Sequence, residues 1–290
     1  MLREDTTHHS KPASMSTTPN SPAHPGRRLA THAAILALVL ALLAWRVWPS
    51  HQLRVIFLET KGDAVLIQTP AGGYILIDGG SDPAALSAAI GRQLPFWRRT
   101  IDLVVLTAAD GAHLPGQVAA LARYRASMVI APAIAKRSSL IEEWQRLLAD
   151  QHTPIRSARA GQRFNIGGAT LRVLAAGDGG ERGLVLRLDY GATSVVFDHS
   201  GGEADEEALS TALRPASLLV FPWQRDAHTA FVTALRPRAM VLTDGQQADK
   251  PIEQTFVERA ISGAALYHER LDGAITWISD GRRAWVETER

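Results

Sequence analysis

Residues 57–80, FLETKGDAVLIQTPAGGYILIDGG, predict β-strands joined by tight turns. The apolar runs DAVLIQT and GYILIDGG are separated by PAGG, whose proline and glycines favour a turn. The run before KGD, LRVIFLET at residues 53–60, predicts another strand. Asp78 ends the last run and is followed by two glycines, which let the backbone turn tightly beneath an acidic side chain. The stretch therefore predicts a sheet with a carboxylate at its end, and Asp63 and Asp78 are both interpreted as turn residues beside glycines.

The next apolar run begins a strand–loop–helix unit at residues 102–116, DLVVLTAADGAHLPG. DLVVLT predicts a buried parallel strand, and a helix is expected over residues 117–124. Loops between a strand and a helix are where α/β proteins place their chemistry. This loop, AADGAH, nevertheless offers only Asp110 and His113 beside three alanines.

The rest of residues 51–290 mixes short strands with strand–helix units. Helices are expected over residues 83–94, 138–150, 203–213 and 253–261, the second capped by Ser138 or Ser139. The two halves follow the same order, because each begins with strands and continues into strand–helix pairs. Two such halves predict an α/β (α+β) domain built as a four-layer αββα sandwich.

The first fifty residues differ in composition from this domain. Residues 1–28 are rich in Ser, Thr, Pro and His, so we expect a disordered tail. Residues 29–48, LATHAAILALVLALLAWRVW, are 20 residues long, about 30 Å as a helix, which matches the hydrocarbon core of a bilayer. Trp45 and Trp48 suit the membrane interface.

Three interpretations of residues 29–48 are open: a buried soluble helix, a cleaved signal peptide and an uncleaved single-pass anchor. A helix that is apolar all round has no evident partner to bury it, and no good Ala-x-Ala cleavage site follows. We expect the anchor. Arg27 and Arg28 precede the span and only Arg46 lies at its end, which favours a cytoplasmic N-terminus and an extracytoplasmic domain in the cell membrane.

Composition excludes some classes of site. The chain has no cysteine, so disulfides and thiolate metal sites are impossible. The chain has 31 basic and 29 acidic residues. Residues 1–50 hold five of the basic and two of the acidic residues, so residues 51–290 hold 26 basic and 27 acidic residues. A domain that binds nucleic acid usually carries a clear basic excess.

The basic loop Trp97-Arg98-Arg99 is interpreted as solvated, with contact to lipid headgroups or DNA phosphate as the alternative.

The sequence resembles the metallo-β-lactamase-like domain of ComEC-type competence proteins. The resemblance is carried by residues 57–80, by DLVVLT, GLVLRLDYGATSVVF and ALRPRAMVLTDG, and by GAITWISDG, and covers most of residues 53–280. It implies an αββα fold and, in competent family members, a metal-dependent hydrolase or nuclease site. Such a site has a His-x-His-x-Asp-His loop, an Asp that bridges two metals and a final His, which together turn bound water into a nucleophile.

Most of these ligands are missing from this chain. The family's first His falls on Ala108, its second on Asp110 and its Asp on Ala112, while only the last His is matched, by His113. The Gly that follows is matched by Gly116. Alanine has no lone pair to offer a metal.

The later ligands are also altered. The bridging Asp belongs near the end of TSVVFDHSGG, where Asp198 stands two residues early and Ser200 at the expected place. The family's Pro-His-His-Gly motif falls on residues 222–225, PWQR. Asp78 is retained, and the resemblance gives it the role of orienting ligands. The candidates for a rearranged site are Asp78, Asp110, His113, Asp198, His199, Asp226 and His228.

The sequence therefore predicts a single-pass membrane pseudoenzyme that acts by binding, with no catalytic residue, no metal ligand and no cofactor. Its partners would be the membrane and a membrane protein complex, with DNA uptake suggested by the resemblance alone. One alternative is a phosphodiesterase or nuclease with a remodelled zinc or manganese site. Another is a cell-envelope binding domain unrelated to DNA.

Overall fold

The computed structural model describes residues 51–134, 137–177, 183–198, 201–223, 229–244 and 263–290, together with residues 32, 34, 35, 37 and 38. The chain divides into two compact units, Met1–Trp48 and Pro49–Arg290. The described residues of the first unit are helical. Among the described residues, no helix has the length and apolar character needed to cross a membrane. The expected tail (residues 1–28), most of the expected span (residues 29–48) and the helix expected at residues 253–261 lie outside these residues.

Within the second unit, the described residues form one mixed sheet of eight strands in the order β17-β16-β1-β2-β3-β5-β7-β8. Neighbours from β17 to β3 are antiparallel, and those from β3 to β8 are parallel. The strands are β1 (Leu53–Phe57), β2 (Ala64–Gln68), β3 (Tyr74–Asp78), β5 (Leu103–Val105), β7 (Val129–Ala131), β8 (Ile155–Ser157), β16 (Ile275–Ser279) and β17 (Ala284–Thr288).

A second mixed sheet has seven strands among the described residues, in the order β15-β14-β13-β12-β11-β10-β9. They are β9 (Arg163–Ile166), β10 (Ala169–Ala176), β11 (Leu184–Tyr190), β12 (Thr193–Phe197), β13 (Leu218–Pro222), β14 (Ala239–Thr243) and β15 (Ala265–Tyr267). Strands β12 to β15 are parallel. The short strands β4 (Thr100–Ile101) and β6 (Arg125–Ala126) pair separately.

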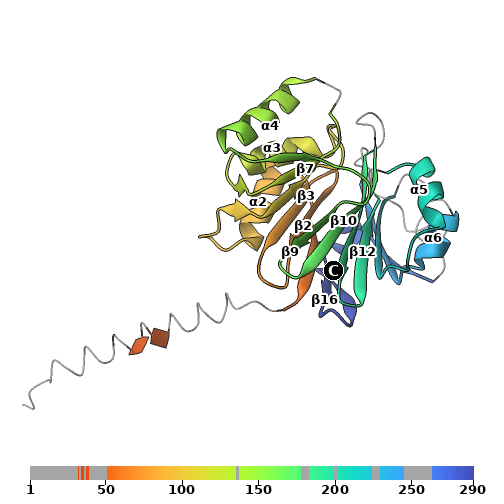
Figure 1. Cartoon of the computed structure of the whole chain (residues 1–290). Helices are drawn as coiled ribbons and strands as arrows, with labels where there is room; N and C mark the ends of the chain where they lie inside the picture. Colours follow the sequence, from red (N-terminus) through yellow and green to blue (C-terminus); the bar gives the residue numbers. More distant parts are fainter. Residues whose placement is uncertain are drawn as a thin grey trace, which may run out of the picture. The chain divides into compact units, whose positions relative to one another are not determined.

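Helices cover the outer faces of both sheets (Figure 1). The first sheet is covered by α2 (Pro83–Gln93), α3 (Leu114–Leu121) and α4 (Ser139–Asp150), and the second by α5 (Glu203–Ser210) and α6 (Thr229–Leu235); α8 (Glu269–Asp272) precedes β16.

The apolar side chains form three cores between these layers. In β3, Ile75 and Ile77 belong to the core between the sheets, whereas Leu76 belongs to the core beneath α2, α3 and α4. This alternation follows from the two-residue period of a strand. A third core lies between the second sheet and its helices. The expected αββα sandwich is confirmed by these layers.

The expected starts of α2 and α5 hold, whereas α3 and α5 each end three residues before their predicted ends. The Ser138 hydroxyl accepts a bond from the Ile141 N–H at the start of α4, as expected, and Asp82, which was not predicted as a cap, caps α2. Helix α3 begins at Leu114, three residues before the predicted start, because Pro115 suits the first turn of a helix.

The parallel strands give the domain two distinct ends. We call the end where β3, β5, β12 and β14 finish the carboxyl edge, and the opposite end the amino edge. The two sheets meet at the carboxyl edge, where Leu184 N–H donates to the Thr107 carbonyl at 3.1 Å. Ligand sites of α/β proteins lie at carboxyl ends of strands, so this edge is where a site is expected.

Candidate functional site

Two glycines bring the end of β3 against the start of α3. Gly79 N–H donates to the His113 carbonyl at 2.8 Å, and Gly116 N–H donates to the Gly80 carbonyl at 3.1 Å. A Cβ on Gly79 would lie 2.0 Å from the Gln117 nitrogen, and one on Gly116 would lie 1.8 Å from the Gly79 oxygen. No larger residue fits at either position. The glycines therefore set the distance between β3 and the loop that carries His113.

Asp78 holds the beginning of that loop. Its backbone has a φ of 56°, the left-handed region that suits a turn, and its side chain is fully buried. One carboxylate oxygen accepts from the Thr107 N–H at 2.7 Å, and the other accepts from the Thr107 hydroxyl at 2.6 Å. The carboxylate thus ties the end of β3 to the end of β5, in addition to forming the turn that the sequence predicted.

The imidazole of His113 lies between two carboxylates. Its Nδ1 is 2.5 Å from Asp110 Oδ1, and its Nε2 is 3.1 Å from Asp63 Oδ2. Asp110 also accepts a bond from the Ala112 N–H, which bends the loop so that its carboxylate reaches the ring. Asp63 is buried, and its backbone N–H donates to the Ala112 carbonyl.

The charges of this group depend on one another. Burial by itself lowers the pKa of His113, but Asp78, Asp110 and Asp63 outweigh burial and raise the pKa well above its ordinary value. For Asp110, burial acts to raise the pKa, yet the contacts with His113 prevail and lower it. The surrounding carboxylates therefore favour the protonated form of His113.

A second histidine–carboxylate pair lies between β14 and the start of α8. His268 Nε2 is 3.2 Å from Asp244 Oδ1, and Arg270 donates to Asp244 Oδ2 at 2.5 Å. Glu269 is buried beside them, and its pKa is raised well above the ordinary value by burial and then by Asp244, Asp63 and Glu59. Asp244 follows the end of β14 and α8 precedes the start of β16, which runs antiparallel to β1, so both pairs lie at the carboxyl edge.

Of the other predicted site residues, the structure describes Asp198. Asp198 follows β12, is fully buried and lies against Gly201, whose added Cβ would be 1.9 Å from Asp198 Oδ1. It stands at the carboxyl edge, because the same Cβ would also contact Val185, the neighbour of Leu184. His199, Asp226 and His228 lie outside the described residues.

The described residues do not fit the metal that the resemblance implies. A histidine binds a metal through a neutral ring nitrogen, and both nitrogens of His113 face carboxylates. Positions 108 and 112 are alanines without donor atoms. Within the described ranges, no group of three or more His, Asp or Glu side chains is arranged to hold an ion. The described His, Asp and Arg side chains at this part of the carboxyl edge lie against one another as ion pairs.

Sequence reasoning missed Asp63, Asp244, His268 and Glu269. The interpretation of Asp63 as a turn residue is corrected, because the turn itself is made by Lys61 and Gly62, both with positive φ, and the Asp63 carboxylate is buried against His113. A polar residue directly after a buried strand was the available signal for Asp244. Nothing local marked His268 or Glu269.

Comparisons with known proteins identify the fold. No family model matches the chain, and no curated protein matches its sequence. A metallo-β-lactamase fold protein of Bacillus subtilis, YhfI, is 14% identical with a TM-score of 0.56, over 81% of this chain and 100% of that one. CmlA, a diiron β-hydroxylase from Streptomyces venezuelae, is 12% identical with a TM-score of 0.50, over 74% of this chain and 52% of that one. The chain therefore has the metallo-β-lactamase fold.

Proposed function

We propose that this protein is a membrane-anchored, single-pass protein whose metallo-β-lactamase-fold domain acts by binding and not by hydrolysis. The observation that carries the proposal is the pair of contacts to His113. Its two nitrogens face Asp110 and Asp63, so the side chain that the resemblance makes a metal ligand serves as the cation of an ion-pair cluster.

The chemistry of the cluster supports a structural use of these charges. The resemblance implies that metal ions would offset the charge of carboxylates at this edge. Here a protonated His113 would place one positive charge between Asp63 and Asp110, and two backbone contacts, from Asp63 to Ala112 and from Gly79 to His113, join the same loops. The loops are thus connected through groups that the chain itself supplies.

The anchor and the process are the finer parts of the proposal. The apolar segment at residues 29–48 would hold the domain at the cell membrane, outside the cytoplasm. The resemblance to ComEC-type proteins suggests DNA uptake within a membrane protein complex, although the near-neutral charge of residues 51–290 gives this no electrostatic support. A cell-envelope partner other than DNA is the alternative binding role.

The test is metal content and hydrolysis measured together. The full-length protein is purified in detergent, incubated with zinc or manganese, desalted, and assayed for bound metal and for hydrolysis of bis(p-nitrophenyl) phosphate. We expect no stoichiometric ion and no turnover, in the wild type and in His113→Ala alike. His152→Ala serves as the control for surface binding, because His152 is exposed in the turn after α4.

One result overturns the proposal in favour of a hydrolase with a remodelled site. It is a stoichiometric ion and phosphodiesterase activity that are both lost in His113→Ala and both kept in His152→Ala. The anchor is tested separately, by whether alkaline carbonate releases the chain from membranes.

A further inference from the structure

The polypeptide enters the second unit at the amino edge. β1 begins at Leu53, which pairs with Ser279 of β16, and the His51 carbonyl accepts a bond from the Tyr190 hydroxyl at 2.7 Å. Ala192 N–H donates to the Gly281 carbonyl. The start of the domain therefore lies beside two turns, one between β11 and β12 and the other between β16 and β17.

Two aromatic side chains project from the same edge. Phe96 is 80% exposed and Trp97 is 48% exposed, and their rings pack edge to face with centroids 4.7 Å apart. Large aromatic side chains that remain this exposed commonly mark a contact surface. Trp, with an apolar ring and a polar N–H, is also enriched at membrane interfaces.

The loop that carries these aromatics is fixed by Arg98. Its guanidinium forms an ion pair with Asp102 at 2.6 Å, donates to the Thr100 carbonyl at 2.9 Å and lies over the ring of Tyr74. Asp102 in turn accepts from the Tyr74 N–H at 2.7 Å. From the sequence we interpreted Trp97-Arg98-Arg99 as a solvated loop. In the structure, Arg98 holds the loop to the start of β3, while Phe96 and Trp97 stay exposed.

A basic cavity lies beside the two turns at the chain's point of arrival, since Ala192 and Arg282 line it. It has a volume of about 580 Å³, and its lining includes Arg236, Arg238, Arg282 and Trp285. No acidic residue is found among the lining residues that the structure describes. Within the described ranges, these three arginine side chains form no hydrogen bond or ion pair. Trp285 is 38% exposed at its rim.

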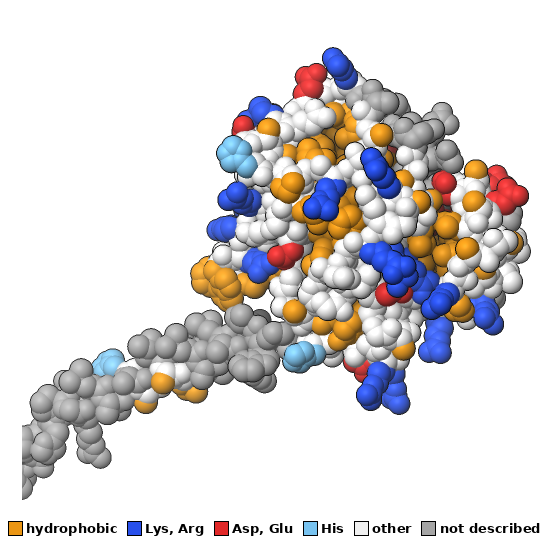
Figure 2. Space-filling model, viewed as in Figure 1, with side chains coloured by type: hydrophobic (Ala, Val, Ile, Leu, Met, Phe, Trp, Pro, Cys, Tyr) orange, Lys and Arg blue, Asp and Glu red, His pale blue; other side chains and the backbone are white. Residues whose placement is uncertain are grey.

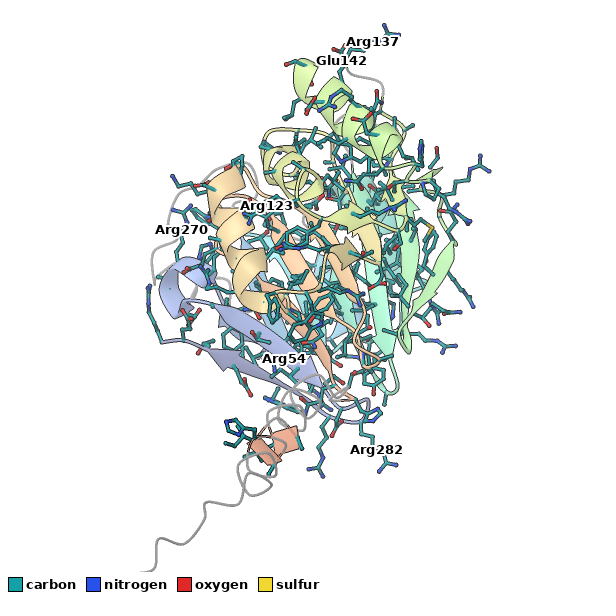
Figure 3. The ribbon with its side chains drawn as sticks, turned by 90° about the vertical axis from the view of Figure 1, so that its left-hand side faces the viewer. Arg54, Arg123, Arg137, Glu142, Arg270 and Arg282 are labelled. Carbon is teal, nitrogen blue, oxygen red and sulfur yellow. The ribbon has the colours of Figure 1, made fainter. Side chains whose placement is uncertain are left out.

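The aromatic loop and the basic cavity lie at the same edge of the domain. The strand order β16-β1-β2-β3 places the β16–β17 turn three strand spacings from the start of β3, which is roughly 15 Å, with β1 between them. Figure 2 shows several basic and fewer acidic side chains at this lower end of the domain. Figure 3 shows Arg54 and Arg282 at the same end, with Arg137 and Glu142 at the far end.

We propose that the amino edge lies on an anionic membrane surface, with Phe96 and Trp97 in the interface and Arg236, Arg238 and Arg282 on lipid phosphates. The proposal rests on the anchor of the proposed function. Since His51 lies at this edge, an anchor over residues 29–48 would be joined to the domain through it. Guanidinium groups bind phosphate through paired donors, and basic side chains near a membrane are attracted to anionic lipids.

This orientation has a consequence for the proposed binding role. The carboxyl edge, with His113 and the second histidine–carboxylate pair, is the opposite end of the same strands. It would face away from the bilayer, and would be the surface available to a partner.

The absence of cysteine makes the proposal directly testable. Single-cysteine variants Phe96→Cys and Glu142→Cys of the full chain are labelled with an environment-sensitive fluorophore and reconstituted into phosphatidylcholine vesicles, with or without phosphatidylglycerol. Glu142 is the matched control, because it is exposed on α4 at the far end. We expect a blue shift at position 96 and loss of its fluorescence with brominated lipids, greater with phosphatidylglycerol, and neither change at position 142.

A second variant isolates the arginines. In the Phe96→Cys background, replacing Arg236, Arg238 and Arg282 by Gln should abolish the effect of phosphatidylglycerol while the chain stays in the vesicles. Equal quenching at positions 96 and 142, or a phosphatidylglycerol effect unchanged by the Gln substitutions, would overturn the proposal. So would a fluorescence change at position 96 produced by a single-stranded oligonucleotide and not by brominated lipids. Release of the wild-type chain by carbonate would instead overturn the anchor on which the proposal rests.

Discussion

His113 Nε2 lies 3.1 Å from Asp63 Oδ2, and both side chains are almost completely buried, at 2% and 1% exposure. The two residues come from different loops of the first sheet, one between β1 and β2 and the other between β5 and α3. Asp110 lies on the other ring nitrogen, so the imidazole is placed between two carboxylates. This relationship leads to four predictions about stability.

Replacing His113 by Ala should destabilise the fold by about 3 to 5 kcal/mol, the usual cost of removing one partner of a buried ion pair. The loss arises because Asp63 is left buried without its cation. Urea unfolding of the two proteins measures the difference. Arg146→Ala is the control, since its ion pairs with Glu143 and Asp150 are exposed on α4, and it should leave the midpoint nearly unchanged. An equal effect of the two substitutions would contradict the buried-pair interpretation.

The contribution of His113 should depend on pH in a defined direction. Since the folded state raises the pKa of His113, its stabilisation is full below the ordinary value near 6.5 and is lost as pH rises through the raised pKa. The contribution of Asp110, whose pKa is lowered, is instead lost as pH falls through that lowered pKa. The difference in unfolding free energy between wild type and His113→Gln should therefore shrink in alkali. A difference that grows with rising pH would refute this.

Glu269→Gln should remove a pH dependence of the wild type. Burial, then Asp244, Asp63 and Glu59, raise the pKa of Glu269, so the folded state favours the neutral acid. The contribution of Glu269 to stability is greatest below its unfolded pKa near 4.5 and falls as pH rises toward the raised value. The neutral amide cannot ionise, so the variant should lose less stability than wild type between acidic and neutral pH. Thermal unfolding at a series of pH values tests this, and parallel profiles would exclude a role for Glu269.

Gly79→Ala should destabilise strongly, whereas Gly91→Ala should not. A methyl group at position 79 would lie 2.0 Å from the Gln117 backbone, and nothing lies within 4 Å of one at position 91. Gly91 is inside α2, where Ala is favoured over Gly by about 0.5 to 1 kcal/mol. Chemical denaturation of both variants measures the contrast. Tolerance of alanine at position 79 would show that β3 and α3 are not in close contact.

Much of the fold could be predicted from the sequence because the signals are local. The continuous apolar run of β3, the Ser138 cap and the glycines after Asp78 each report on their own few neighbours. The same is true of Ala108 and Ala112, whose lack of donor atoms is a property of the residue itself. The two-sheet sandwich followed from the order of such elements.

The partners of the buried charges could not be predicted in this way. Asp63 beside Gly62 is indistinguishable, locally, from an exposed turn residue, and His268 and Glu269 lie in no recognisable motif. Their roles depend on contacts between residues that are far apart in the sequence, namely His113 with Asp63 and His268 with Asp244. Such pairs are set by strand order and by the close approach of Gly79 to α3.

The sequence by itself thus determined the layers of the domain and the absence of donor atoms at Ala108 and Ala112, since both follow from residue type and spacing. Only the tertiary structure decided what the remaining polar groups do, because burial and distance fix a side chain's charge, and neither exists before the chain has folded.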